Sequence, residues 1–262
     1  MSVPMNLVGR RSCGAVISRE AWARQEPRPT WLLNRTVSLL LLFLVLFSPL
    51  VRAADNQLTD SEKHQGWLLL FDGRTHDGWM TSASQPSKTA VEQSALNPHR
   101  SGAYMLVHTQ QWANFLLALD FKITNGCNSG IFVRTSPLTS KPGRDVGFNG
   151  LEIAIDDTKD AGFHDTGAIY DLVKPTKNSM KPAGEWNHVE IVCLGSRIEV
   201  ALNGEPVTRA DLDLFTRPGV RPDGSAHKFD VAWKEHPRRG YIGLQDHGSP
   251  CWFKNIKLRL LP

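Results

Sequence analysis

Residues 115–123 decide the fold class because apolar side chains recur in them at every second position. They read Phe115-Leu116-Leu117-Ala118-Leu119-Asp120-Phe121-Lys122-Ile123. Successive side chains of an extended strand point to opposite faces. One face therefore carries the Phe, Leu and Ile side chains at the odd-numbered positions, and the other face ends in Asp and Lys. The stretch predicts a β-strand that turns one face towards a hydrophobic core.

The same two-residue period continues along the chain. Val189, Ile191 and Cys193 share one face of a segment that turns at Gly195-Ser196 and returns to Asn203-Gly204, a hairpin signal. Further strands are predicted at 67–71, 103–109, 129–135, 150–156, 167–173, 228–234, 240–245 and 251–260. No long helical periods separate them, which argues against a doubly wound α/β fold. The pattern predicts an all-β sandwich of two antiparallel sheets.

The N-terminus has the features of an export signal. Residues 37–47 form an uncharged apolar run, which Arg35 precedes and Val51-Arg52-Ala53 follows. A cationic flank, a short apolar stretch and a small-residue exit are typical of a secretory signal peptide. A membrane anchor formed by residues 37–51 is the alternative, although a spanning helix needs about 20 apolar residues. We expect cleavage after Ala53 and a periplasmic or extracellular protein.

The rest of the chain, residues 54–262, is predicted to form one domain. Thr59-Asp60-Ser61-Glu62 matches a capping box, so one short helix is expected to open it. The first 53 residues hold 7 Arg and 2 acids out of totals of 30 and 26, which leaves 23 basic and 24 acidic residues and a net charge of −1. A balanced charge does not attract phosphate backbones, which argues against nucleic acid as a partner. Membrane contact is expected only through an uncleaved signal.

Cysteine usage gives little sign of a metal or disulfide framework. The predicted domain has Cys127, Cys193 and Cys251, an odd number, so at most one disulfide forms. No C-x-x-C pair is present, which argues against a thiolate zinc site. Buried, unpaired thiols are the simpler expectation.

Residues 150–157 carry the first candidate site residues. In a strand, Leu151, Ile153 and Ile155 point into the core, while Glu152 and Asp156 point to the other face with Ala154 between them. Acids at such positions suit a sugar or metal site, and a solvated strand face is the ordinary alternative. The Cα atoms of Glu152 and Asp156 would lie about 13 Å apart. A retaining glycosidase needs carboxyl groups about 5–5.5 Å apart, so this pair does not fit that mechanism.

Polar residues at three other strand ends complete the candidates. His164, Tyr170 and Asp171 offer a base, a phenol and an orienting carboxylate. Gln245-Asp246-His247 closes another strand before Gly248, and Arg134 closes a third, where it could pair with Glu152 or hold an oxyanion. A surface histidine, a strand aromatic and a self-bonded turn are the corresponding structural alternatives.

Motifs in these segments together resemble the 3-keto-disaccharide hydrolase family, over about 58–260. They occur in this order: Gly66–Gly73 with Gly78-Trp79, Asn128–Arg134, Gly150-Leu151-Glu152, Thr166–Tyr170, Glu185-Trp186-Asn187, Leu202-Asn203-Gly204, Gly240–Gly248 and Phe253–Ile256. That family is similar in fold to concanavalin A-like lectins and glucanases. The resemblance implies a jelly-roll sandwich with a concave sugar-binding sheet. One departure is Ala154, where the E-x-Q pattern of the family has Gln.

The resemblance also implies an activity, the cleavage of glycosides already oxidised at C3. A C3 carbonyl acidifies the hydrogen on C2, so a base can remove it, the enolate can expel the group at C1, and water can add to the glycal. His164 or Asp157 is then a candidate base. Arg134, or a divalent metal ion held by acids, would stabilise the enolate, and His247 or Tyr170 would protonate the leaving group.

The expected substrate is thus a 3-keto glycoside or disaccharide, and no cofactor beyond that divalent metal is implied. The catalytic candidates are Glu152, Asp157, His164, Tyr170 and His247, and the substrate-binding candidates are Arg134, Asp156, Gln245 and Asp246. The alternative function is a secreted, non-catalytic lectin-like module that binds sugars through Trp79, Trp112, Trp233 or Trp252. An envelope scaffold that neither binds nor turns over sugar is a third.

Overall fold

The computed structural model describes residues 54–262, so the predicted signal peptide and extension at 1–53 lie outside the described residues. The strands are β1 (Trp67–Leu69), β2 (Trp79–Thr81), β3 (Met105–Trp112), β4 (Phe115–Ile123), β5 (Asn128–Thr135), β6 (Leu151–Asp156), β7 (Asn187–Leu194), β8 (Arg197–Leu202), β9 (Glu205–Asp211), β10 (Gly240–Gln245) and β11 (Cys251–Leu260). One α-helix, α2 (Asp60–His64), and three 3-10 turns, η1 (Val146–Asn149), η2 (Leu212–Leu214) and η3 (Trp233–Glu235), complete the described part.

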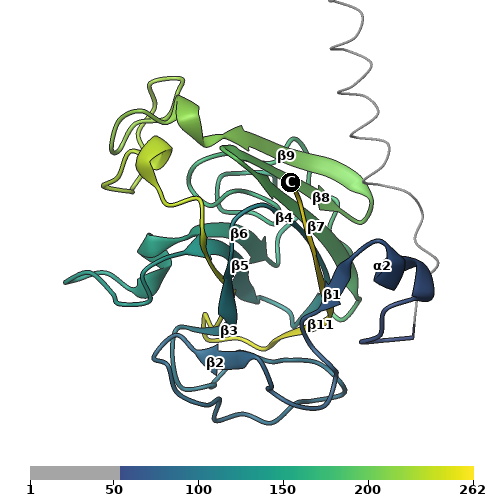
Figure 1. Cartoon of the computed structure of the whole chain (residues 1–262). Helices are drawn as coiled ribbons and strands as arrows, with labels where there is room; N and C mark the ends of the chain where they lie inside the picture. The colour runs from purple at the N-terminus through teal and green to yellow at the C-terminus, as the bar shows by residue number, and fades with distance from the viewer. Residues whose placement is uncertain (1–53) are drawn as a thin grey trace, which may run out of the picture. The chain divides into compact units, whose positions relative to one another are not determined.

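The strands form two antiparallel sheets. The six-stranded sheet has the order β1-β11-β4-β7-β8-β9, and the five-stranded sheet has the order β2-β3-β10-β5-β6. In Figure 1, β7, β8 and β9 run side by side in one sheet, and β5 and β6 lie next to each other in the second. The predicted all-β jelly-roll sandwich with one short N-terminal helix is confirmed.

Two of the predicted strands are not strands. Residues 167–173 make single bridges, Ile153 to Ile169 and Ile169 to Val173, around a tight turn. Residues 228–234 form a loop that leads into η3. Apolar residues in both segments pack against the core from the side, so their pattern records burial rather than sheet pairing.

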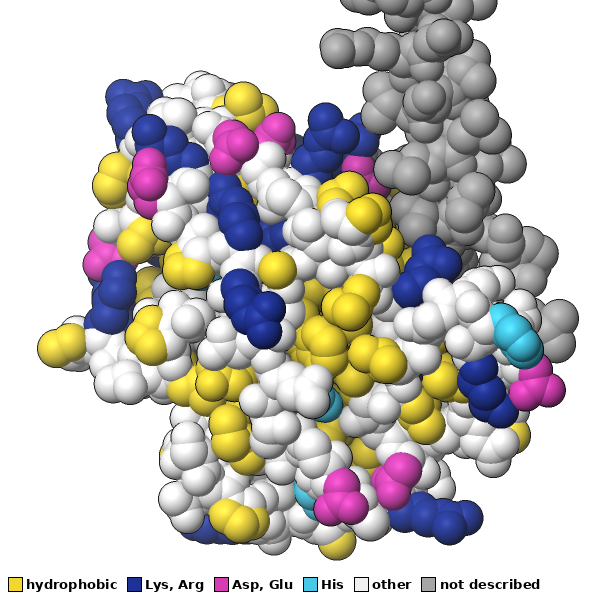
Figure 2. Space-filling view, viewed as in Figure 1, with side chains coloured by type: hydrophobic (Ala, Val, Ile, Leu, Met, Phe, Trp, Pro, Cys, Tyr) yellow, Lys and Arg dark blue, Asp and Glu magenta, His cyan; other side chains and the backbone are white. Residues whose placement is uncertain are grey.

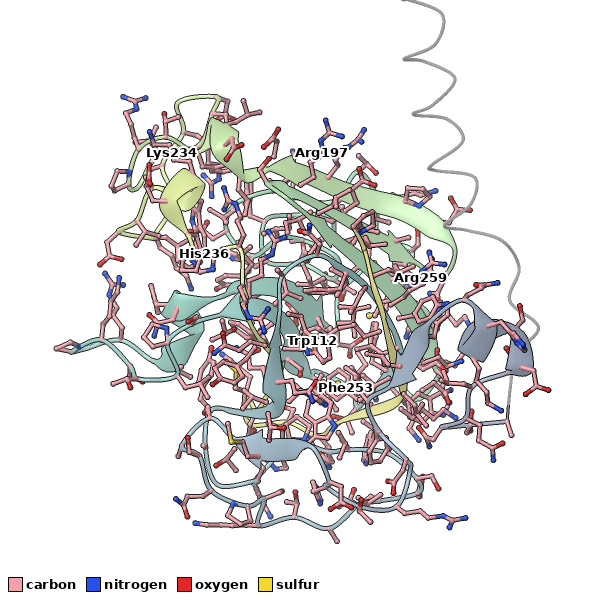
Figure 3. The ribbon with its side chains drawn as sticks, viewed as in Figure 1. Trp112, Arg197, Lys234, His236, Phe253 and Arg259 are labelled. Carbon is pink, nitrogen blue, oxygen red and sulfur yellow. The ribbon has the colours of Figure 1, made fainter. Side chains whose placement is uncertain are left out.

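The core lies between the sheets. All five apolar side chains that the period of β4 assigns to one face, from Phe115 to Ile123, belong to it. In Figure 3, Trp112 and Phe253 lie towards the middle of the view, whereas Arg197 and Lys234 lie at its margin. Cys127, Cys193 and Cys251 are buried free thiols, as expected. In the described residues, no helix has the length and apolar character needed to cross a bilayer.

The other face of β4 carries a buried polar cluster around Asp120. Asp120 is 2% exposed; its Oδ1 lies 2.7 Å from Nδ1 of His188 on β7, and its Oδ2 accepts a 2.6 Å hydrogen bond from Asn255 on β11. Glu190 lies on the other side of the imidazole, 4.0 Å from Nε2. Burial would lower the pKa of His188, but the hydrogen bonding and charge of Asp120 and Glu190 outweigh it and raise this pKa to about 9. The cationic imidazole therefore joins the two central strands β4 and β7.

We predict that this cluster makes stability depend on pH. A raised folded-state pKa stabilises the protein fully below about 6.5, the unfolded value, and this stabilisation is lost as the pH rises towards 9. His188→Gln should lower the free energy of unfolding by about 1–2 kcal/mol at pH 6, less than for a fully buried pair because the imidazole is partly exposed. Urea unfolding of both proteins measures this. A difference that stays constant between pH 6 and pH 9.5 would contradict the assignment.

Candidate active site

The candidate site lies on the outer face of the five-stranded sheet. Leu151, Ile153 and Ile155 of β6 point into the core, as predicted, and Glu152 and Asp156 are partly exposed on the other face. The same face of the sheet carries a small apolar cluster of Met105, Val107, Phe132 and Val146. Phe132 on β5 is the direct partner of Glu152. The carboxyl group of Glu152 therefore stands beside apolar side chains rather than in open water.

Gly130 gives Glu152 its position. A Cβ atom at residue 130 would lie 2.7 Å from Cγ and 2.8 Å from Oε1 of Glu152, closer than atoms normally approach. The Glu152 side chain thus lies across the backbone of β5 in space that only glycine leaves free. Gly130 pairs with Ala154, so both residues of this pair are small.

This environment changes the acidity of Glu152. Burial raises the pKa of the carboxyl group from 4.5 to about 8; the positive charge of Lys228 opposes the shift and the negative charge of Asp145 adds to it. A carboxylic acid with such a pKa can give or take a proton near neutral pH. This is the property expected of an acid–base catalyst.

Two phenols stand beside this carboxyl group. Tyr104, just before β3, accepts a 2.6 Å hydrogen bond from Nε2 of Gln245, and burial followed by the charge of Glu152 raises the pKa of Tyr104. Tyr170 lies on the other side, where its backbone N–H donates to the carbonyl of Glu152 at 2.9 Å. Burial and then the charge of Glu152 raise the pKa of Tyr170 as well. Both phenols therefore keep their protons at neutral pH and can act as donors.

Gln245 has unused hydrogen-bonding capacity. Its side chain is 2% exposed, and its Oε1 has no hydrogen-bond partner among the described residues. A buried acceptor without a donor is costly, so it marks a polar position next to Tyr104.

Loops complete the wall around Tyr170. The imidazole of His164 stacks on the Tyr170 ring with centroids 4.6 Å apart, and its Nε2 lies 3.6 Å from Oδ1 of Asp171. From the other loop, Nζ of Lys228 lies 4.1 Å from the centroid of the same ring. His164 is thus brought to the site, although as an exposed partner of Tyr170.

The remaining predicted residues form a separate group at the other end of β6. Asp156 is partly exposed, and its pKa is raised by burial, with His247 as a nearby opposing charge. Oδ2 of Asp157 accepts a 2.6 Å hydrogen bond from the backbone N–H of Gly126. Asp246 accepts from the N–H groups of Arg100 and Gly248. Asp157 and Asp246 therefore fasten loops, and Asp156 and His247 remain available to a ligand.

The expectation that Arg134 pairs with Glu152 or holds an oxyanion there is wrong. Arg134 is fully buried, and its guanidinium donates to the backbone carbonyls of Ala113 and Gly195 at 2.7–3.2 Å. The register between β5 and β10 shifts by one residue, so that three steps on β5 match two on β10, and Arg134 has a φ of 55°. This bulge turns the side chain away from the face of Glu152.

Metal-binding groups do not converge in the described part of the chain. Across residues 54–262, no group of three or more His, Cys, Asp or Glu side chains is placed to hold a metal ion. The acids around Glu152 are spread along β6 and its loops, so the residues present do not fit the divalent metal of the expected alternative.

The chain matches the family model described as 3-keto-alpha-glucoside-1,2-lyase-like domain over residues 66–259. It belongs to this family. A curated 3-keto-disaccharide hydrolase from Bacteroides thetaiotaomicron is 28% identical over 230 residues, which cover 75% of this chain and 79% of the relative. The predicted family membership is confirmed, and these similarities support a carbohydrate hydrolase.

Solved structures of family-like proteins share the fold. A crystal structure of a proposed glycosyl hydrolase from Parabacteroides distasonis has 31% identity and a TM-score of 0.59, over 74% of this chain and 99% of that one. A second from the same organism has 24% identity and a TM-score of 0.64, over 80% and 100%. At 24% identity, the second structure shows only that the two proteins share the sandwich fold.

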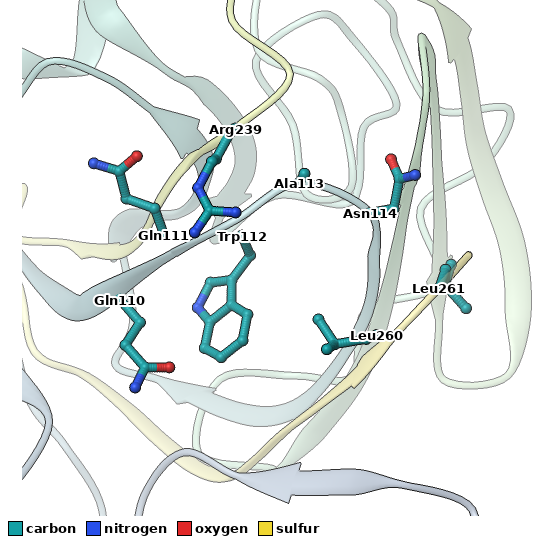
Figure 4. Close-up of a pocket in the computed structure, with 8 residues that line it drawn as sticks. All are labelled: Gln110, Gln111, Trp112, Ala113, Asn114, Arg239, Leu260 and Leu261. Atoms are coloured by element: carbon teal, nitrogen blue, oxygen red, sulfur yellow. The ribbon is translucent and has the colours of Figure 1, made fainter.

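A sizeable pocket of this family member lies away from the site. It has a volume of about 500 Å³ and lies where β3 turns into β4, beside the end of β11. Figure 4 shows Trp112 with Arg239 and Leu260 around it. Figure 2, which has the viewpoint of Figure 1, shows hydrophobic side chains gathered in the middle of the molecule. Its lining includes Trp112, a candidate of the lectin-like alternative, but none of the catalytic or substrate-binding candidates of the hydrolase prediction.

We predict that Gly130→Ala releases Glu152 from its buried position. The added methyl group would displace the carboxyl group towards water, so its pKa should fall from about 8 towards 4.5. A carbon-13 NMR titration of the Glu side chains measures this value. Gly162→Ala is the matched control, because its methyl group would meet the side chain of a different acid, Asp165. An unchanged Glu152 pKa in Gly130→Ala would disprove the packing argument.

Proposed function

We propose that this protein hydrolyses glycosides whose sugar ring carries a ketone at C3. The observation that carries the proposal is Glu152, a partly buried carboxyl group with a pKa of about 8, whose charge acts on the phenols of Tyr104 and Tyr170. The family and the Bacteroides relative, named as a 3-keto-disaccharide hydrolase, support this substrate class.

Glu152 takes the role of base in the proposed mechanism. The hydrogen on C2 of a 3-keto sugar is acidic, because the electron pair left behind moves onto the ketone oxygen. Ionised Glu152 removes this hydrogen. We prefer it to the two bases suggested from the sequence, because Asp157 is held by Gly126 and His164 is an exposed side chain stacked on Tyr170.

The enolate then expels the group at C1. The oxygen of this leaving group needs a proton, which Tyr170 or the protonated Glu152 can give. The product is a glycal with a C1–C2 double bond, and addition of water gives the free 3-keto sugar. Gln245 is 2% exposed and donates to the phenol of Tyr104, so its part is to hold that phenol in position rather than to meet the sugar.

A non-catalytic lectin-like module is less well supported. Trp79, Trp112 and Trp233 are 0–7% exposed, so they cannot offer a face to a sugar. Trp252 is partly exposed, and its indole N–H donates to Glu92 at 2.8 Å. Nζ of Lys122 lies 5.0 Å from the centroid of the Trp252 ring. Three of the four tryptophans therefore offer no aromatic platform, and the fourth already has a cation against its ring.

The activity test compares a 3-keto disaccharide with the same disaccharide before oxidation. Release of free sugar from the keto form alone is expected, and the rate should fall about tenfold per pH unit as the pH drops below about 8, because protonated Glu152 cannot act as base. Glu152→Gln should lower the rate by about 10²–10⁴-fold and remove this pH limb. Glu185→Gln, at an exposed acid far along the chain, is the control.

Either of two outcomes would contradict this proposal. Equal cleavage of both disaccharides would show that the ketone is not needed. Saturable binding of the keto form without release of sugar would favour the lectin-like module instead.

We also propose that the protein is exported and processed. The support is the apolar run at 37–47 with its flanking Arg35 and Ala53. The mature protein should begin at Ala54, which N-terminal sequencing of the protein from the source cells would reveal. A chain that retains residues 37–51 and stays with the membrane fraction would instead indicate an anchor.

A further inference from the structure

We propose that Lys228 is a further catalytic residue, the cation that stabilises the oxyanion formed at O3 of the substrate. This inference rests on the proposed function and adds to it the group that carries the largest change of charge in the reaction. It replaces Arg134, the cation suggested from the sequence.

The ammonium group of Lys228 contacts three aromatic rings but forms no ion pair in the described residues. Its Nζ lies 4.1 Å from the ring centroid of Tyr170, 5.0 Å from that of Phe148 and 5.5 Å from that of Phe229. None of the ion pairs within residues 54–262 includes it. Aromatic faces attract a cation without neutralising it. Lys228 is exposed, so water reaches its ammonium group, but no described ion pair neutralises its charge.

This charge acts at the right place. A hydrogen bond between their backbones makes Tyr170 and Glu152 neighbours, and Nζ of Lys228 lies over the Tyr170 ring. The positive charge of Lys228 lowers the pKa of Glu152. Arg144 also lies over Phe148, at 4.4 Å, but no contact between Arg144 and the Tyr170 ring is found in the described residues.

A buried ion pair fixes the loop that carries Lys228. The backbone N–H of Lys228 donates to Oδ2 of Asp171 at 2.7 Å, and Oδ1 of Asp171 accepts from Arg221 at 2.6 Å. Arg221 is 8% exposed, and its guanidinium stacks on Phe163 at 3.9 Å. Asp171 thus ties the Lys228 loop to the segment that carries His164 and Tyr170. The backbone of Lys228 is therefore fixed, and its ammonium group lies on the Tyr170 ring before any substrate binds.

The step balances without a co-reactant. Glu152 takes the C2 proton, the C–H electron pair forms a C2–C3 double bond, and the C3 carbonyl pair moves to O3 as negative charge beside Lys228. Return of this charge re-forms the ketone, creates the C1–C2 double bond and breaks the bond from C1 to the leaving oxygen, which takes a proton. Lys228 is neither consumed nor required to transfer its proton.

The test isolates formation of the enolate from loss of the leaving group. The probe is a 3-keto sugar that lacks a leaving group at C1, incubated in D₂O with the full protein while proton NMR follows exchange of the C2 hydrogen. Lys228→Met should slow this exchange about 10²–10³-fold, as expected for loss of one oxyanion donor. Lys228→Arg should retain most of the rate, because it keeps the charge. Lys174→Met, at an exposed lysine with no ion pair in the described structure, is the matched control.

A pH profile separates this role from a structural one. Lys228 lowers the pKa of Glu152, which also interacts with Asp145, Tyr104 and Tyr170. Lys228→Met should therefore raise this pKa and shift the rise of the exchange rate with pH to higher pH. A merely structural loss would lower the rate without moving the limb. If circular dichroism shows that Lys228→Met is unfolded, Lys228→Gln and Lys228→Arg take its place. Lys228→Gln should slow the exchange of the C2 hydrogen, and Lys228→Arg should not.

The outcomes distinguish this proposal from the function on which it rests. Exchange at the wild-type rate in folded Lys228→Met would overturn the role of Lys228 and leave the proposed function intact. Absence of exchange and of turnover in the wild-type protein would overturn the proposed function, and the role of Lys228 with it.

Discussion

The chemistry proposed for this protein depends on one carboxyl group that the fold keeps partly out of water. Glu152 lies across β5 because Gly130 has no side chain, and it stands beside Phe132, its partner in the sheet. Removing water from a carboxylate favours its neutral form, which places the pKa near 8 rather than 4.5. A rigid sheet is well suited to this, because pairing with β5 prevents the strand from turning the acid back towards solvent.

The sheet and the acid could be predicted from the sequence, because both follow from a period of two. The alternation in β4 and β6 assigns Phe121 and Ile153 to the core, and it sets Glu152 on the opposite face. Tyr104 and Lys228 could not be found in this way. In the predicted strand 103–109, alternation puts Tyr104 on the core face with Leu106, but Tyr104 precedes β3 and packs with Met105 on the other face. Lys228 lies in a segment that was predicted to be a strand and is a loop. Their partners lie 141 and 57 residues away along the chain, at Gln245 and Asp171.

Arg134 shows why alternation fails where a strand is irregular. A regular strand would put it on the face of Phe132, two residues earlier, and hence near Glu152. The bulge adds one residue to β5 at this point and reverses the direction in which the later side chains of the strand point. The guanidinium then reaches Ala113 and Gly195, which turn out of β3 and β7, and so it links the ends of the two sheets. A strand-end arginine in a sequence is therefore ambiguous between a ligand site and a cross-link until the register is known.

The division of the site between sheet and loops has a consequence for recognition. The floor next to Glu152 is the pair Gly130 and Ala154, which offers no polar side chain where the family pattern places Gln. The Glu152 side chain fills the space above Gly130, and Ala154 is 2% exposed, so this pair offers a sugar no polar surface of its own. In the proposed function, recognition of the sugar then falls to the loops of Tyr170 and Lys228, which Asp171 and Arg221 hold together. Because loops vary more readily than paired strands, the proposed proton chemistry would belong to the sheet and the choice of sugar to the loops.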